Sequence, residues 1–111
     1  MTPDLLHRLL AAHPNLFLAL RVPPRIARPD GRPIPNRLVD PDHNIRPDWL
    51  RLLQEFPDRF VIGADKFIGP SGEKARVAAS FDPTWALVEQ LPDALAEKIG
   101  GANARRIYGL D

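Results

Sequence analysis

Cysteine is absent from the 111 residues of this chain. Without a thiol, the chain can form neither a disulfide framework nor a thiolate nucleophile, and a zinc site with cysteine ligands is excluded. Histidine is also scarce, because the sequence contains only His7, His13 and His43. A metal site on this chain is therefore restricted to these histidines and to the carboxylates of Asp and Glu.

A charge excess of one sign is missing as well. The 15 basic and 14 acidic residues leave a net charge of +1, so the chain has no overall field that would attract nucleic acid or an anionic membrane. No apolar stretch approaches the roughly 20 residues that cross a bilayer, and the first residues lack the charged and apolar regions of a secretory signal. We therefore expect a cytoplasmic protein that binds neither nucleic acid nor membrane.

The composition that remains is that of an ordinary globular domain, with 44% hydrophobic and 26% charged residues. We treat residues 1–111 as a single segment. Apolar spacing and capping residues predict helices over 2–13, 47–56, 82–91, 92–100 and 102–108, and strands over 16–22 and 59–65. Gly100 and Gly101 are expected to end a helix. Trp49 and Trp85 are expected in the core, because they occupy helical positions together with leucines.

Both predicted strands are nearly continuous apolar runs, which is typical of strands in a sheet covered by helices on both faces. A strand, a long connection containing a helix, and a second strand form a βαβ unit, whose strands are parallel in nearly all cases. The predicted fold class is therefore α/β with two parallel strands. Two strands alone cannot bury both faces or pair their outer edges, so we expect further strands from elsewhere or self-association through the exposed strand edges.

Polar residues stand at the ends of both predicted strands. The apolar run 60–64 ends abruptly in Asp65, and Arg21 lies near the end of the first strand. Catalytic groups gather at the carboxyl ends of parallel strands, because the loops that follow converge there. Asp65 is therefore the first candidate catalytic residue, with capping of the next turn or pairing with a cation as its alternative role. Arg21 is a candidate for bidentate binding of a substrate carboxylate, with a salt bridge to a neighbouring strand as its alternative.

The connection over 23–45 contains six prolines and no usable period, so a long irregular loop is expected. Its arginines are diluted by aspartates and no aromatic residue is interleaved for base stacking, so we expect a solvated loop rather than a nucleic-acid patch. Asp40, Asp42 and His43 suggest a metal site by their closeness, but a proline-broken loop is a poor rigid scaffold for ligands.

Several segments occur in an order that resembles the C-terminal third of the amidohydrolase superfamily. They are PNLFLALRV, a helix, PDRFVIGAD, DPTWALVEQLP and LAEKIGGANARRIYGL. More narrowly, the chain resembles metal-dependent (β/α)8-barrel hydrolases whose last barrel strand ends in Gly-Ser-Asp or Gly-Thr-Asp and whose tail reads Asn-Ala-x-Arg-x-Tyr-Gly. The resemblance implies a partial TIM barrel, in which the two strands are equivalent to barrel strands seven and eight.

The resemblance further implies a metal-dependent hydrolase that acts on a small-molecule substrate. Asp65 matches the acid that in the family binds the divalent metal, Zn or Mn, or takes the proton from the metal-activated water. A carboxylate beside a divalent cation is suited to both roles. The tail motif is matched by Asn103, Ala104, Arg106 and Tyr108, to which we assign packing and capping.

The chain departs from the family pattern at three points. Ala64 stands where the family usually has Ser or Thr, Lys66 is bulkier and more charged than expected after the acid, and the His-x-His pair of the first barrel strand is absent. A closed barrel also needs about 250 residues. We therefore expect the chain alone to bind no metal tightly and to be inactive in hydrolysis. The alternative is a non-catalytic binding or oligomerisation module derived from the barrel.

Overall fold

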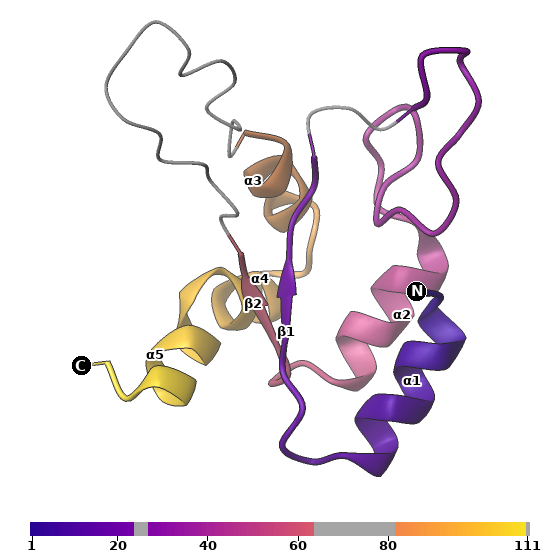
Figure 1. Ribbon diagram of the computed structural model, residues 1–111. Helices are drawn as coiled ribbons and strands as arrows, with labels where there is room; N and C mark the ends of the chain where they lie inside the picture. Colours follow the sequence, from indigo (N-terminus) through magenta and orange to yellow (C-terminus); the bar gives the residue numbers. More distant parts are fainter. Residues whose placement is uncertain (24–26, 64–81, 111) are drawn as a thin grey trace, which may run out of the picture.

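The computed structural model describes residues 1–23, 27–63 and 82–110, which form two strands and a set of helices (Figure 1). The α-helices are α1 (Pro3–Ala12), α2 (Pro47–Glu55), α3 (Asp82–Glu89), α4 (Asp93–Glu97) and α5 (Asn103–Tyr108), and a π-helical segment, η1 (Lys98–Ala102), joins α4 to α5. The strands are β1 (Leu18–Leu20) and β2 (Phe60–Ile62). Within these described ranges, no helix has the length and apolar character that crossing a membrane requires.

The first two helices begin where the sequence predicts. Thr2 caps α1, because its Oγ1 accepts a hydrogen bond from the Leu5 N–H at 3.2 Å, and Pro3 opens the first turn. α2 also begins at a proline, Pro47, and carries Asp48 in its first turn, where a carboxylate is favourable beside the positive end of the helix dipole. The two helices pack against each other.

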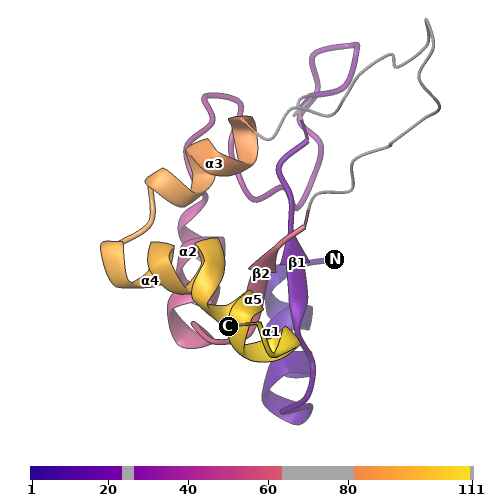
Figure 2. The same cartoon turned by 90° about the vertical axis from the view of Figure 1, so that its left-hand side faces the viewer.

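The strands β1 and β2 pair in parallel, with Leu18 opposite Phe60 and Leu20 opposite Ile62. The predicted mixture of helices with two parallel strands is therefore confirmed, although both strands are shorter than predicted. Figure 2 shows α2, α3 and α4 on one side of the strand pair. Ala19 points to the opposite face from its two neighbours and is exposed, so the described residues leave that face partly open at β1.

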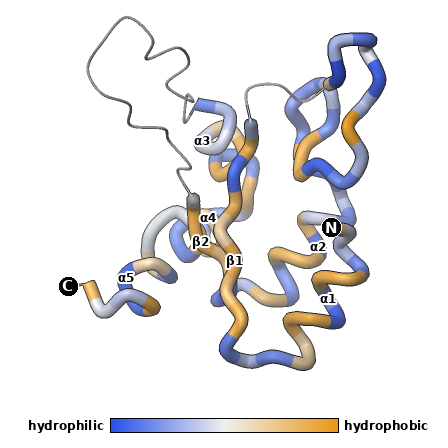
Figure 3. The backbone as a smooth tube through the Cα atoms, viewed as in Figure 1, coloured by the Kyte–Doolittle hydropathy of each residue, from blue (hydrophilic) through white to orange (hydrophobic). Residues whose placement is uncertain are grey.

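The main core lies between the strands and the helices that flank them. Its buried members are Leu6, Leu10, Leu20, Trp49, Leu52, Leu53, Phe60, Leu91, Leu95 and Ile99. Figure 3 shows both strands as largely hydrophobic, whereas the loop between β1 and α2 is largely hydrophilic. A smaller cluster of Val22, Val39 and Leu87 packs α3 and this loop against the carboxyl end of β1.

The prediction that Gly100 and Gly101 end a helix is wrong. The chain passes from α4 through η1 into α5 without leaving helical geometry, and the helix ends only at Gly109, whose φ of 64° is left-handed. Glycine in a helix costs only about 1 kcal/mol relative to alanine, so packing can override it. At Gly100 a Cβ atom would lie 3.6 Å from Val88 Cγ1, which shows how closely this segment lies against α3.

The prediction that Trp85 lies in the core is also wrong, because this side chain is 47% exposed. The inward face of α3 is formed by Thr84, Leu87 and Val88, and Trp85 falls outside it. Thr84 occupies an inward position because its Oγ1 accepts a hydrogen bond from the buried Val22 N–H at 3.0 Å. A polar residue thus takes the position that hydrophobicity alone would give to the tryptophan.

The tail motif holds the start of β2. Asn103 is 0% exposed, and its Nδ2 donates hydrogen bonds of 2.8 Å to the carbonyl oxygens of Pro57 and Phe60. Arg106 donates to Asn103 Oδ1 at 3.3 Å and to the carbonyl oxygen of Asp58. These are packing and capping contacts, as the sequence predicts for Asn103 and Arg106.

The side chain of Asp58 lies beside two cations in the same region. Lys98 Nζ is 2.9 Å from Asp58 Oδ1, and Arg106 Nη1 is 3.5 Å from it. The hydrogen bond from Lys98 lowers the pKa of the Asp58 carboxyl, desolvation opposes this, and the charges of Lys98 and Arg106 lower the pKa further. Because the Asp58 side chain is 51% exposed, solvent screens the contact, and its contribution to stability is at most about 1 kcal/mol.

Arg59 connects β2 to the turn between α1 and β1. Its Nε donates to the Leu16 carbonyl oxygen at 2.7 Å, and its Nη2 donates to the carbonyl oxygen of His13, the residue that caps the end of α1. The guanidinium also lies over the ring of Phe17, 5.6 Å from its centroid. A cation at this place stabilises the negative end of the α1 dipole and fixes the position at which β1 begins.

Candidate functional site

The carboxyl ends of β1 and β2 lie side by side at one edge of the sheet. The Gly63 N–H donates to the Leu20 carbonyl oxygen at 2.9 Å, which continues the parallel ladder past β2. In this register Arg21 comes beside Gly63, because Leu20 is opposite Ile62. The predicted meeting of the two strand ends is therefore confirmed, and Arg21 lies at it.

Glycine is required at position 63 by the closeness of β1. A Cβ atom at Gly63 would lie 2.8 Å from the Cβ of Ala19, which is shorter than ordinary contacts between carbon atoms. Asp65, the predicted catalytic and metal-binding residue, follows two positions later and lies outside the described residues. The structure thus places Arg21, while the roles of Asp65 stay predictions.

A cavity of about 220 Å³ opens beside Arg21. Its lining comes from the first residue, from β1 and its extension, from the loop between β1 and α2, and from the first turn of α2: Met1, Ala19, Leu20, Arg21, Asn36, Arg37, Leu38 and Trp49. Arg21 and Arg37 contribute two guanidinium groups, and no Asp or Glu of the described ranges is among the lining residues. A cavity with this charge suits an anionic group.

Two residues that line this cavity carry a buried hydrogen-bond donor without an acceptor. Within the described part of the chain, the buried side-chain nitrogens that lack a hydrogen-bond partner are Arg37 Nε, Arg46 Nε and Trp49 Nε1. Arg37 and Trp49 both line the cavity. A buried donor left without an acceptor costs about 1–3 kcal/mol, and folded proteins contain few of them. Arg37 and Trp49 therefore each carry a buried donor that the described residues do not satisfy.

Sequence reasoning identified Arg21 but missed Asn36, Arg37 and Trp49 as site residues. The loop contains several arginines in similar local contexts, and no pattern distinguishes Arg37 from the others. Its position follows from tertiary structure, because the antiparallel bridge between Val39 and Ile45 folds the end of the loop back on itself before α2. Trp49 is a core residue, as predicted, that also lines the cavity.

The cluster of Asp40, Asp42 and His43 forms a turn. Asp40 Oδ1 accepts hydrogen bonds from the backbone N–H groups of Asp42 at 2.9 Å and Asn44 at 3.0 Å, an arrangement typical of turns built around an aspartate. His43 has a left-handed φ of 65°. The described residues contain no group of three or more histidine or carboxylate side chains that could hold a metal ion, so on their own they do not fit the divalent metal that the resemblance implies.

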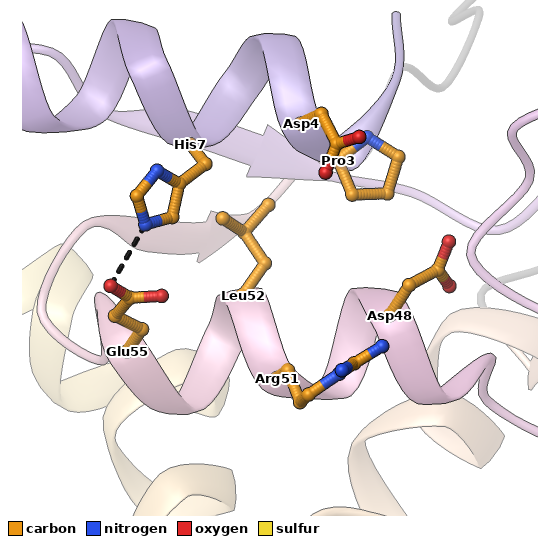
Figure 4. A pocket seen from close by; sticks show the side chains of 7 residues that line it. All are labelled: Pro3, Asp4, His7, Asp48, Arg51, Leu52 and Glu55. Carbon is orange, nitrogen blue, oxygen red and sulfur yellow. Dashed lines mark hydrogen bonds and ion pairs between the residues drawn. The ribbon is translucent and has the colours of Figure 1, made fainter.

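A second cavity, of about 240 Å³, lies between α1 and α2. Figure 4 shows its lining, in which His7 of α1 reaches Glu55 of α2 with an Nε2 to Oε1 distance of 2.8 Å. The His7 ring also meets Phe56 edge-on, with 5.3 Å between the ring centroids. The His7 and Glu55 side chains are 43% and 55% exposed, so the pair is a surface contact of small energy. Helix packing explains these residues, and the cavity beside Arg21 is the candidate site.

The candidate site is a cavity lined by two arginines at the shared carboxyl edge of two parallel strands. Arg21, Arg37 and Trp49 come from three separate parts of the chain, and only the fold brings them together. No protein-family model, curated protein or solved structure matches the chain.

Proposed function

We propose that the chain is the closing part of a metal-dependent hydrolase barrel of the amidohydrolase type, equivalent to barrel strands seven and eight with their helices. The parallel pairing of β1 and β2 supports this proposal, because the strands of such a barrel are parallel and their carboxyl ends form the active-site face. The main observation in its favour is that these two carboxyl ends meet. Arg21 lies there beside Gly63, and Gly63 precedes Asp65 by two positions in the sequence.

In this proposal Arg21 binds a carboxylate of a small-molecule substrate, because its planar guanidinium can donate two parallel hydrogen bonds. Asp65 is the proton acceptor in the hydrolysis of a carbonyl-type centre. The described residues form no group of metal ligands. The proposal therefore assigns the other ligands of the metal to barrel strands other than these two.

The coding sequence upstream of Met1 provides the first test, since the proposal predicts an in-frame extension whose first strand bears His-x-His. In the protein that carries it, Asp65→Asn is expected to lower metal-dependent hydrolysis by about 10²–10⁴-fold, the usual effect of losing a general acid or base. Asp42→Asn removes an exposed loop carboxylate and is expected to retain the original rate. Equal rates in the two variants, or metal-dependent hydrolysis by the 111-residue chain alone, would contradict the proposal.

A further inference from the structure

We propose that the cavity beside Arg21 binds the carboxylate of a small organic acid, and that Arg37, Asn36 and Trp49 are binding residues together with Arg21. The identification of this acid as a substrate rests on the proposed function. The binding itself is inferred only from the lining of the cavity and is testable without a metal or a reaction.

The donors of the cavity are the first part of the argument. Arg21, Arg37, Asn36 and Trp49 all carry side-chain N–H groups, and Arg37 Nε and Trp49 Nε1 have no acceptor among the described residues. No Asp or Glu of the described ranges lines the cavity. A carboxylate bound there would therefore meet the guanidinium groups of Arg21 and Arg37 and the amide of Asn36, with no acidic side chain of the lining to repel it.

The size and the remaining lining indicate which anion fits. The volume of about 220 Å³ lies below the range of about 300–1,000 Å³ that is usual for sites of drug-sized ligands, so a small molecule fits better than a nucleotide. Met1, Ala19, Leu20 and Leu38 give the cavity an apolar part. An organic acid offers both a carboxylate for an arginine fork and an apolar body for these side chains, whereas inorganic phosphate has no apolar part.

Fluorescence of Trp49 gives a direct assay. The chain contains two tryptophans, and Trp85→Phe leaves Trp49 as the only one while changing a side chain that is 47% exposed. Sodium butyrate is titrated at constant ionic strength, with sodium phosphate and sodium chloride in parallel. We expect a saturable change of the Trp49 emission with butyrate, and no saturable change with chloride.

Variants on the same loop test the role of Arg37. Arg37→Gln is expected to weaken butyrate binding by at least about tenfold, because hydrogen bonds to charged groups are among the stronger ones. The matched control is Arg32→Gln, whose side chain is 77% exposed and pairs with Asp30, and it should leave the affinity unchanged. If circular dichroism shows that Arg37→Gln does not fold, Arg37→Lys replaces it. This variant keeps the charge but not the bidentate fork, and it should also bind more weakly.

Three results would overturn the proposal: no saturation by butyrate, saturation by phosphate but not by butyrate, or equal affinities in folded Arg37 and Arg32 variants. The titration contains no metal and measures no hydrolysis. Its failure is therefore distinguishable from a failure of the Asp65→Asn test, which concerns the reaction alone.

Discussion

Replacement of Asn103 by alanine is expected to destabilise the fold strongly, although this residue is neither apolar nor part of the candidate site. The side chain is 0% exposed, and its Nδ2 donates to the carbonyl oxygens of Pro57 and Phe60, both at 2.8 Å. β1 binds β2 through other groups, since the Leu18 N–H donates to the Arg59 carbonyl oxygen. Because successive carbonyls alternate along a strand, the Phe60 carbonyl faces the outer edge of β2, where Asn103 is its partner.

The magnitude follows from the two acceptors. The Phe60 carbonyl is buried at this contact, and leaving a buried acceptor without a partner costs about 1–3 kcal/mol. The Pro57 carbonyl is partly buried and can regain water, so its loss is that of an ordinary hydrogen bond, about 0.5–1.5 kcal/mol. Together these terms predict a loss of about 1.5–4.5 kcal/mol in the free energy of unfolding, a large fraction of the roughly 5–15 kcal/mol of a typical domain.

Urea unfolding followed by far-ultraviolet circular dichroism measures this loss. Asn44→Ala, at an exposed position, is the matched control and is expected to change the free energy of unfolding by less than about 0.5 kcal/mol. Asn103→Asp keeps the shape but replaces the donor with an acceptor, and it should also destabilise the fold at neutral pH. Equal midpoints for Asn103→Ala and Asn44→Ala, or wild-type stability of Asn103→Asp, would refute the reasoning.

Two further predictions concern the same strand and its surroundings. Gly63→Ala is expected to lower the free energy of unfolding, measured with urea, by about 1–3 kcal/mol, because its Cβ would lie 2.8 Å from the Cβ of Ala19. Adding Ala19→Gly should restore much of this loss. Gly101→Ala, whose Cβ would meet nothing within 4 Å, is the control, and an equal loss there would contradict the prediction. The pKa of Asp58 is lowered in the folded state, so its ionised carboxylate stabilises the fold at pH values above the unfolded pKa of about 3.9. This contribution is lost as the pH falls through the lower pKa of the folded state. Asp58→Asn should therefore be less stable at pH 7 and lose less stability as the pH falls below about 4, and identical acid unfolding curves would exclude the contact as a contributor.

The features that the sequence predicted correctly depend on local chemistry, on the order of the elements along the chain, or on the tail motif. Thr2 and Pro3 mark the start of α1, because capping involves only neighbouring residues. The parallel direction of β1 and β2 follows from the order strand, helix, strand. Asn103 was assigned to packing from the tail motif alone, and its contacts with the start of β2 agree.

The features that could not be predicted depend on contacts between distant residues. Trp85 and Thr84 are adjacent on α3, and the inward position is decided by the Val22 N–H, which lies 62 positions before Thr84 in the chain. Gly100 stays helical because neighbouring packing outweighs its poor helix propensity. Arg37 belongs to the candidate site only because the loop folds back to the end of β1, and no short-range pattern contains that information.

The register of the two strands ties the stability of the fold to the geometry of the site. A shift of one residue would move every side chain of a strand to the opposite face, and Arg21 would no longer lie beside the cavity. Arg59 fixes the register at the amino end of β2, because it bonds the Leu16 carbonyl just before β1, and Gly63 fixes it at the carboxyl end. Neither residue lines the cavity. Substitutions that weaken them should therefore also weaken anion binding, because the same backbone pairing that holds the core together places Arg21.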